Sequence, residues 1–501
     1  MITRPLLTAP LTAALLCSGS AAFAGLTAEG LWQEWQASAA RAGLTLQADV
    51  RQASDGALTL RGIALSMGNG ARLQLSELEL ASKPDGSVEI RPGDLALHSP
   101  GTADGDLPQL SQSGLSVTAT EPASGGIRYS YQAAEVALTY DVTIGPADAG
   151  RKAQSRSVLT GLRGSFSDTP GALREFALEL KASRLMSEMR LTGADADASA
   201  APLSRSDTEG LALRGELTLP DSVLPGSITD AASFRAALMA GLRVSFDAAQ
   251  GITLGEGRDD AFPLPYAMSL RSEPVSGGIA LSKDAFRLNA ESAALDFHIT
   301  TPLGPAPMDV SFGAARFALT LPATARDAAA PYALQIGVRD LSMSETAWAV
   351  FDSGRVLPRD PLQFDLDLNG DMRLDLVALA SEQVDAASPF DLILPESLTL
   401  RKALLAAAGA SFEAEGAFRF TPQGRDLLPI GQAHLALSGI ERLIRALTTL
   451  GVMQPEDATV AMAMLRSFTR PGPGVDTWIS DIEAHRDGAV TLNGTNVTQL
   501  R

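Results

Sequence analysis

Residues 57–90 read ALTLRGIALSMGNGARLQLSELELASKPDGSVEI, and this stretch decides the fold. Apolar residues stand at every second position through most of it, with polar or charged residues between them. A period of two is typical of β-strands that have one apolar and one solvated face. Asn69-Gly70 and Asp85-Gly86 interrupt the alternation, and such dipeptides tolerate the positive φ angles of tight hairpin turns. The stretch therefore predicts successive antiparallel hairpins joined in a meander.

The same alternation extends in both directions, starting at Leu44 and including a further turn at Asp55-Gly56. The predicted strands cover residues 44–48, 58–62, 73–80, 88–97, 115–120, 127–131, 134–144, 158–166, 176–185, 189–192, 211–219, 242–246, 267–270, 278–281, 285–288, 295–300, 308–312, 316–321 and 333–338. LTLRG at Leu58–Gly62 and LALRG at Leu211–Gly215 hint at duplicated hairpins. We predict a mainly β protein, with long, antiparallel, curved meander sheets and a few amphipathic helices.

The first helix is expected directly before the strands, as a lid. Thr27 is a suitable N-cap, and Gly43 ends the helical pattern. The apolar positions at helical spacing are Leu31, Trp32, Trp35 and Ala39. The two tryptophans suit either a membrane-interface anchor or a lid that packs on the sheet. Because Arg41 is the only basic residue of the helix, the sequence favours the lid.

Further helices are predicted from their capping residues. One begins at Ser227 or Thr229 and ends at Gly241, and two begin with capping boxes, Ser342 with Glu345 and Ser438 with Glu441. Gly451 ends the last of these, and Pro455 begins a partner helix, so the C-terminal region is predicted to contain an αα-hairpin packed against sheet.

The apolar residues of that partner helix have two interpretations. They are Val460, Met464, Leu465 and Phe468. Met464, together with Met453 and Met462, suits an adaptable binding surface. Ordinary core packing is the interpretation that the sequence favours.

The N-terminus resembles a secretory signal peptide. Arg4 precedes an apolar stretch over residues 6–20, and Ala22-Phe23-Ala24 is a small-x-small cleavage site. We predict a signal peptide over residues 1–24, cleavage between Ala24 and Gly25, and a periplasmic mature protein. The alternative is an uncleaved anchor, but the stretch is shorter than the roughly 20 apolar residues that a spanning helix needs.

Composition excludes several classes of chemistry. The single cysteine, Cys17, lies in the predicted signal peptide, so the mature chain has no thiol for disulfides, catalysis or metal binding. The formal net charge is −18, and the mature chain, with 39 basic and 58 acidic residues, carries −19. A nucleic-acid partner is therefore not expected.

No later segment is apolar enough to span a membrane, so the mature protein is expected to be soluble.

Domain organisation stays open at this level. Residues 25–501 are interpreted as a single elongated β-rich unit, or as two lobes divided near residues 194–210, which are rich in Ala, Asp and Ser. The oligomeric state does not follow from the sequence.

One motif resembles a calcium-binding loop. Asp365, Asp367, Asn369, Gly370 and Asp371 match the first half of such a loop. Position twelve is Leu376, where a bidentate glutamate is required. We favour a hairpin with a turn at Asn369-Gly370 and the acidic side chains on its solvated face.

Catalytic and cofactor motifs are missing from the sequence. The histidines His98, His298, His434 and His485 are scattered singly, and no serine-hydrolase elbow, phosphate-binding loop or complete dinucleotide fingerprint occurs. We therefore predict no catalytic, cofactor-binding or metal site. Asn493-Gly-Thr and Asn496-Val-Thr are formal glycosylation sequons and are interpreted as a polar chain end.

Several motifs resemble those of exported alphaproteobacterial proteins known only as domain of unknown function 2125. They are Gly30–Gln36 (GLWQEWQ), Trp348 onward into Leu357–Pro361 (LPRDP), Phe468–Gly472 (FTRPG), Asp487-Gly and Leu492–Gly494 (LNG). The resemblance spans nearly the whole mature chain, and it implies no activity and no catalytic residues. In the general pattern of its sequence the chain is also similar to AsmA-like envelope proteins, whose curved sheets form an apolar groove associated with lipid handling.

Three functions are compatible with these observations. The first is a non-enzymatic periplasmic protein that shelters an apolar ligand, such as a lipid, in a β-sheet groove. The second is an envelope scaffold that binds another protein through a strand edge or the C-terminal helix pair. The third is a carbohydrate-active enzyme, which needs two carboxylates about 5 to 9 Å apart in a cleft.

Overall fold

The computed structural model describes residues 25–41, 43–66, 72–93, 95–98, 108–144, 151–192, 202–221, 223, 228, 230–259, 265–301, 307–379, 393–423 and 426–499. The predicted signal peptide lies outside these residues, so cleavage after Ala24 stays a prediction. Contacts divide the chain into two compact units, Met1–Asp259 and Asp260–Arg501. Of the predicted linker near 194–210, residues 194–201 are outside the description, and residues 204–210 belong to a strand.

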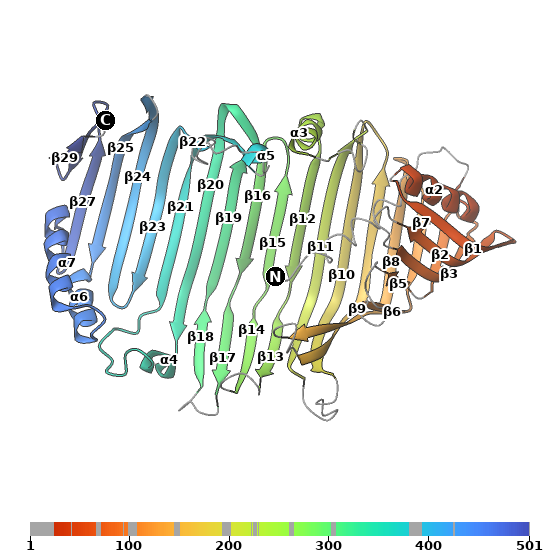
Figure 1. Ribbon diagram of the computed structural model, residues 1–501, viewed down its shortest axis with the longest axis horizontal. Coiled ribbons are helices and arrows are strands. Elements are labelled where there is room, and N and C mark those ends of the chain that lie inside the picture. The colour runs from red at the N-terminus through yellow and green to blue at the C-terminus, as the bar shows by residue number, and fades with distance from the viewer. Residues whose placement is uncertain are drawn as a thin grey trace. The chain divides into compact units, whose positions relative to one another are not determined.

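The first unit consists of antiparallel strands, with two helices among its described residues (Figure 1). Its elements are α2 (Ala28–Arg41), β1 (Thr45–Ser54), β2 (Ala57–Ser66), β3 (Arg72–Ser82), β4 (Val88–Pro92), β5 (Leu95–His98), β6 (Gln109–Ser113), β7 (Ser116–Thr120), β8 (Ile127–Ile144), β9 (Arg151–Thr169), β10 (Leu173–Leu191), β11 (Ser204–Pro220), α3 (Ala231–Ala240), β12 (Arg243–Gln250) and β13 (Thr253–Asp259).

The second unit is built in the same way, with four helices among its described residues. Its elements are β14 (Tyr266–Ser272), β15 (Val275–Leu281), β16 (Ala285–Ser292), β17 (Leu295–Thr300), β18 (Met308–Phe312), β19 (Ala314–Pro322), β20 (Thr324–Met343), α4 (Glu345–Ala349), β21 (Leu362–Asp375), α5 (Leu376–Leu379), β22 (Ile393–Pro395), β23 (Ser397–Ala407), β24 (Ala410–Gln423), β25 (Asp426–Ser438), α6 (Ile440–Thr449), α7 (Pro455–Phe468), β26 (Arg470–Pro471), β27 (Thr477–Ala484), β28 (Ala489–Leu492) and β29 (Thr495–Gln499).

The strand pairings confirm the predicted mainly β fold of antiparallel meanders. β1 and β2 form a tight hairpin in which Ser54 pairs with Ala57. The turn residues Asp55 and Gly56 have φ angles of 41° and 80°, as the sequence predicted for this dipeptide. Asn69-Gly70 lies outside the described residues. None of the described helices is both long enough and apolar enough to cross a membrane.

Helix α2 covers the sheet of the first unit, as the lid interpretation predicted. Leu31 and Trp32 are buried, and they pack with residues such as Leu60, Leu80 and Phe166 in one apolar cluster. The indole N–H of Trp35 donates a 2.9 Å hydrogen bond to the Tyr129 hydroxyl. The tryptophans are thus part of the core of the first unit, because burying their large apolar surface against the sheet stabilises both elements.

A line of breaks crosses the strands of the first unit and bends its sheet. Gly62, Gly114, Gly161 and Gly210 all have φ between 61° and 64°. The strand register places Gly161 opposite Ala134 and Gly210 opposite Ser183, and the Gly251 amide donates to the Gly210 carbonyl at 2.8 Å. Such left-handed glycines within strands or between two successive strands sharpen the local twist, so together they curve the sheet.

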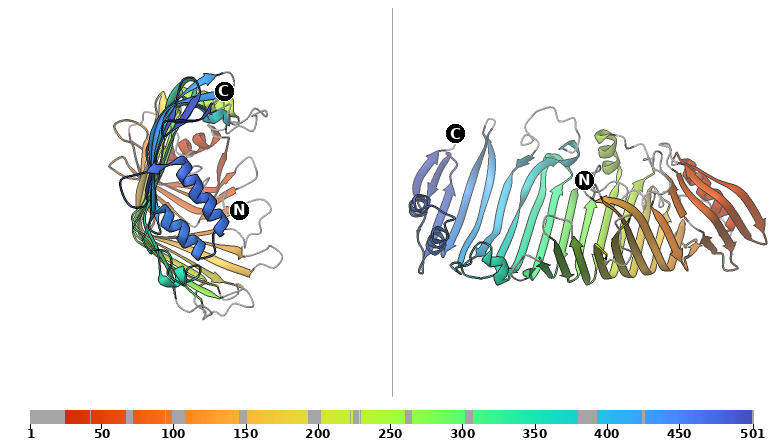
Figure 2. Two further views of the ribbon diagram at one scale, coloured as in Figure 1. Left: turned by 90° about the vertical axis from the view of Figure 1, so that its left-hand side faces the viewer. Right: turned by 60° about the horizontal axis from the view of Figure 1, so that its bottom comes forward.

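The second unit has a corresponding line of breaks that uses few glycines. β14 and β15 are separated at residues 273–274, β16 and β17 at 293–294, and β18 and β19 at Gly313. In β20, Asp340 has a φ of 57° and the register shifts between Val338 and Leu341. Figure 2 (left) shows the bowed strands of this unit, with α6 and α7 on the concave side.

Three predicted helix starts are wrong by one to three residues. α3 is capped by Asp230, which exchanges hydrogen bonds with Ser233, and not by Ser227 or Thr229. Ser342 and Ser438 do not cap helices, because their hydroxyls pair across strands with Ser311 at 2.9 Å and Ser411 at 2.7 Å. The cap of α4 is Ser344, and α6 begins after Gly439, where the distant Asp476 carboxylate accepts from the amides of Glu441 and Arg442.

The hairpin predicted at Asn369-Gly370 is also wrong. β21 runs without a turn from Leu362 to Asp375, and Gly370 pairs with Tyr332. A Cβ on Gly370 would lie 2.0 Å from the Ser397 carbonyl oxygen and 2.9 Å from the Tyr332 ring. The glycine is needed here because the tyrosine crosses over it, and not because the backbone turns.

Candidate functional site

The concave side of the second unit carries rows of apolar side chains. Residues directly opposite each other on neighbouring strands share a face, so the register defines these rows. One row contains Leu288, Leu319, Leu334, Leu368 and Leu400, a second contains Phe317, Ile336 and Leu366, and a third contains Val338, Phe364, Leu405, Phe412, Leu437 and Trp478. We call these residues the open apolar face. With strands about 4.8 Å apart, the five residues of the first row span roughly 19 Å.

The side of the sheet on which this face lies follows from one hydrogen bond. Ser480 pairs with Leu435, which stands two residues from Leu437 on β25 and therefore shares its face. The Ser480 hydroxyl donates at 2.9 Å to the carbonyl of Phe468, the last residue of α7. Because α7 lies on the concave side, the open apolar face is concave (Figure 2).

This face is not covered as the sheet of the first unit is covered. Ile336, Leu366 and Phe412 are only half-buried, and Leu405 is 45 % exposed. In the first unit the corresponding positions under α2, such as Leu60 and Leu80, have no exposed surface. Among the described residues, α5 covers one margin, where Leu379 packs with Tyr332 and Leu368. Helices α6 and α7 lie over the other margin, at β24 and β27. The central rows therefore remain accessible.

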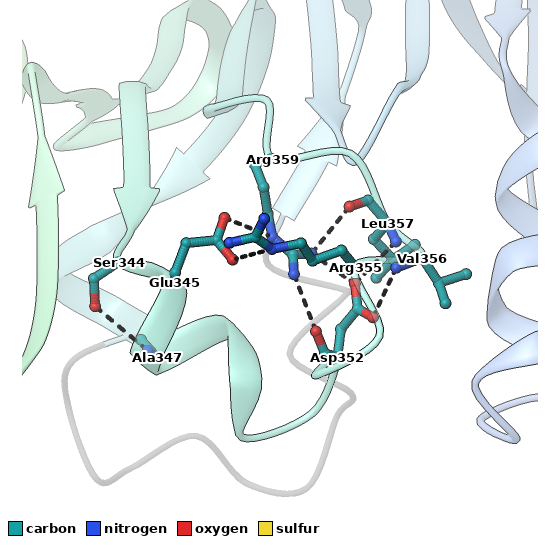
Figure 3. A network of polar contacts seen from close by, with 8 residues as sticks. All are labelled: Ser344, Glu345, Ala347, Asp352, Arg355, Val356, Leu357 and Arg359. Carbon is teal, nitrogen blue, oxygen red and sulfur yellow. Dashed lines mark hydrogen bonds and ion pairs between the residues drawn. The ribbon is translucent and has the colours of Figure 1, made fainter. Parts of the chain in front are cut away.

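A polar clamp fixes the loop at one end of this face (Figure 3). The Asp352 carboxylate accepts hydrogen bonds from the amides of Val356 and Leu357, both at 2.9 Å, and from Arg359 Nη1 at 2.6 Å. The Arg359 guanidinium also stacks on the Trp348 ring, with 4.5 Å from Cζ to the ring centroid. The clamp thus holds this loop through charge-assisted hydrogen bonds to a buried carboxylate.

The clamp also changes the acidity of Asp352. Burial opposes ionisation of this carboxyl, but the hydrogen bonds from Arg359 and the two amides prevail and lower its pKa to about 2. Glu345 contacts Arg359 at 3.4 Å and Arg355 at 3.2 Å, which extends the network to the start of α4. Trp348 and the 357–361 motif, which carry part of the family resemblance, are thus brought together for a structural purpose.

The C-terminal motifs of that resemblance also meet. Asn493 accepts from the Asp481 amide at 2.9 Å and donates to the Phe468 carbonyl at 3.2 Å. Asp481 contacts Arg470 at 2.6 Å and His434 at 2.7 Å. The hydrogen bonds from His434 and Arg470 lower the pKa of Asp481. Asn493, the first residue of a sequon, therefore lies in the β28–β29 turn as an anchor.

Two of the three acidic residues of the calcium-like motif are neutralised by cations on the polar face of the sheet, and the third, Asp371, accepts a hydrogen bond from the Ser397 hydroxyl at 3.1 Å. Asp365 pairs with Arg316 at 2.8 Å and with Lys402 at 3.2 Å, and Asp367 pairs with Arg401 at 2.7 Å. No group of three or more ligand side chains able to hold a metal occurs among the described residues. The loop interpretation that the sequence disfavoured is not supported.

The histidines are single surface residues, as the sequence predicted. His298, His434 and His485 each have one acidic neighbour, respectively Asp309, Asp481 and Glu483. Their side chains are between 44 % and 46 % exposed. The side chain of His98 lies outside the described residues.

The predicted core packing of α7 is largely wrong. Leu465 is buried, but Val460, Met464 and Phe468 are 52 %, 56 % and 53 % exposed. These three residues recur every four positions, so they form an apolar stripe on one side of the helix. Only the tertiary structure reveals this exposure, because helical periodicity does not say which apolar residues find a partner.

A comparison with protein families identifies the family of this chain. The sequence model of a bacterial family, described as an uncharacterized protein conserved in bacteria (DUF2125), matches residues 216–501. The match includes the whole second unit. The motif Gly30–Gln36, which is part of the resemblance, lies outside the matched residues. No curated protein and no solved structure matches the chain.

Proposed function

Because the chain belongs to the DUF2125 family, whose description assigns no activity, we propose a function from its geometry: the open apolar face binds an apolar ligand, such as the acyl chain of a lipid. We further propose that the protein acts in the periplasm after export and does not transform the ligand. The observation that carries this proposal is the set of half-buried rows on the concave side of the second unit.

The free energy of binding would come from removing apolar surface from water. Contiguous exposed apolar patches larger than a few hundred square ångströms are rare on soluble proteins and usually mark a binding site. A ligand that removes about 300 Å² of this surface from water contributes roughly 7 kcal/mol before the entropy cost of binding.

One polar atom beside the rows supports a ligand with a polar end. The indole N–H of Trp478 is buried and has no hydrogen-bond acceptor among the described residues. Trp478 stands at the β27 end of the third row, opposite Leu437. A carboxylate or ester oxygen of a lipid would supply the missing acceptor, and a buried donor gains from such a bond.

The test is native mass spectrometry of the full chain, purified from the periplasm without detergent, with organic extraction of the bound material. We expect a stoichiometric apolar molecule on the natural protein. Ile336→Glu places a charge in the middle of the rows and should abolish it. The matched control is Thr320→Glu on the polar face, opposite Arg287, and it should retain the molecule. A natural protein without any bound molecule would overturn the proposal.

A second candidate function, protein binding at the C-terminal helix pair, is favoured by the exposed stripe on α7. Its three apolar side chains are each more than half exposed, and such a stripe suits docking of a partner's apolar surface. Crosslinking in cells should capture one specific protein with the natural chain. Met464→Lys should lose that protein, and Thr459→Lys, at an exposed polar position of α7, should keep it. Equal capture by both variants would reject the stripe as the docking surface.

A further inference from the structure

Two cations lie directly opposite each other on the polar face of the first unit. The strand register pairs Arg163 of β9 with Lys181 of β10. Both side chains are exposed, and among the described residues neither makes a hydrogen bond or an ion pair. Like charges directly opposite in a sheet destabilise it. This pair therefore carries a repulsion that no hydrogen bond or ion pair among the described residues relieves.

Other arginines on the same strands and the next one are neutralised by a carboxylate. The pairs are Arg156–Glu135, Arg174–Asp168, Arg184–Asp207, Arg190–Glu188 and Arg214–Glu216. The whole chain has 58 acidic and 40 basic residues, so carboxylate partners are abundant. Arg163 and Lys181 differ from these pairs because they face each other across neighbouring strands and neither makes an ion pair with a carboxylate among the described residues.

Hydroxyl groups surround the two cations in a shallow depression of about 490 Å³. The register aligns Thr118 with Ser130 and Ser130 with Ser165, and it places Gln132 beside Arg163. Arg128 approaches the Ser165 hydroxyl at 3.5 Å, which adds a third cation at the margin. Glu179 is the one carboxylate in the lining of this depression. The surface thus presents two adjacent cations among hydroxyl and amide groups, with one carboxylate in the lining and a further cation at the margin.

We propose that this depression binds a phosphate group, as a free phosphate compound or as a lipid headgroup. A phosphate carries up to two negative charges and three oxygen acceptors, so it neutralises both cations and accepts from the hydroxyls at once. Binding removes the repulsion between Arg163 and Lys181. The phosphate site lies on the polar side of the first unit's sheet and is independent of the open apolar face.

The test uses the full chain and isothermal titration with inorganic phosphate at constant ionic strength. Arg163→Ser combined with Lys181→Ser should weaken binding about tenfold or more. Arg156→Ser combined with Arg190→Ser removes the same charge from paired positions and should change binding less than about threefold. Glu179→Gln removes the carboxylate of the lining and should strengthen binding. No phosphate binding by the natural chain, or equal loss in both double variants, would overturn the proposal.

Two further measurements separate folding from binding and distinguish the sources of the phosphate. In phosphate-free buffer the Arg163/Lys181 double variant should melt at a temperature equal to or above that of the natural chain, because the repulsion is gone. A lower melting temperature would contradict the argument. Sedimentation with vesicles of phosphatidylcholine and phosphatidylglycerol, if abolished by the same double variant, identifies a headgroup. Phosphate binding without sedimentation identifies a free phosphate compound.

Discussion

The two units are built from the same kind of strand, but the apolar face of the sheet is covered in the first unit and open in the second. In the first unit α2 places Leu31 and Trp32 over the sheet, and both become buried. In the second unit the rows around Ile336 remain half-buried. The difference teaches that an alternating strand pattern defines an apolar face but not what covers it. A covered face contributes to stability, and an open one is available for binding.

The sharpest test of this comparison is truncation under the lid. Trp32→Ala should destabilise the first unit by about 3–5 kcal/mol, because it leaves a cavity in a filled core. Ile336→Ala on the open apolar face should cost only about 1 kcal/mol, since its side chain is only partly removed from water. Denaturant unfolding of the full chain measures both. Equal losses at the two positions would contradict the distinction between a covered and an open face.

A second contrast concerns two buried aspartate–arginine pairs, one in each unit. Asp168 binds Arg174 through two 2.7 Å hydrogen bonds, yet its burial prevails and raises its pKa. Asp352 also accepts from two backbone amides, and its pKa falls to about 2. Asp352→Asn should therefore lower the melting temperature at neutral pH by roughly 5 °C. Asp168→Asn should lower it less.

The pH dependence of the two pairs should have opposite signs. A lowered pKa means that the Asp352 contribution is present above about pH 4 and is lost as the pH falls toward 2. The raised pKa of Asp168 means that its ionisation costs stability as the pH rises through that pKa. Melting curves between pH 2 and pH 7 measure this difference. An identical pH profile for Asp352→Asn and the natural chain would refute the assignment.

A third test uses a feature that the units share. Tyr131 crosses Gly164 and donates to the Glu179 carbonyl at 2.6 Å, and Tyr332 crosses Gly370 and donates to the Ser397 carbonyl at 3.2 Å. A Cβ at either glycine would lie 2.0 Å from that carbonyl oxygen. Gly164→Ala and Gly370→Ala should each cost about 1–3 kcal/mol through overpacking. Unchanged melting temperatures of both variants would show that the strands on either side of each glycine move apart easily to admit the added methyl group.

The smallest expected effect is at α7. Met464→Ser should change the free energy of unfolding by no more than about 0.5 kcal/mol, because the side chain is 56 % exposed. Leu465→Ala on the buried side of the same helix should cost about 2 kcal/mol or more. Chemical denaturation of the two variants compares them directly. A large loss for Met464→Ser would mean that the stripe is packed in solution.

Part of the curvature has a signal in the sequence. Gly62, Gly114, Gly161 and Gly210 are each followed by Leu or Ile, and they stand 52, 47 and 49 residues apart. The similarity of LTLRG and LALRG drew attention to Gly215 instead, which lies within β11 and has no positive φ. A polar residue, a glycine and then Leu or Ile, recurring about every 50 residues, thus marks the line of breaks in the first unit. In the second unit Asp340 replaces such a glycine, so no comparable signal exists there.

The sequence by itself determined the antiparallel strands, the lid formed by α2 and the single histidines, because alternation, capping and helical spacing are local properties. Only the tertiary structure decided that Asn369-Gly370 continues a strand, that Asp476 caps α6 from a distance, and that the stripe on α7 is exposed. These outcomes depend on which segments become neighbours. The local sequence around a residue does not specify which other segment will bury or cap it, or whether it will stay exposed.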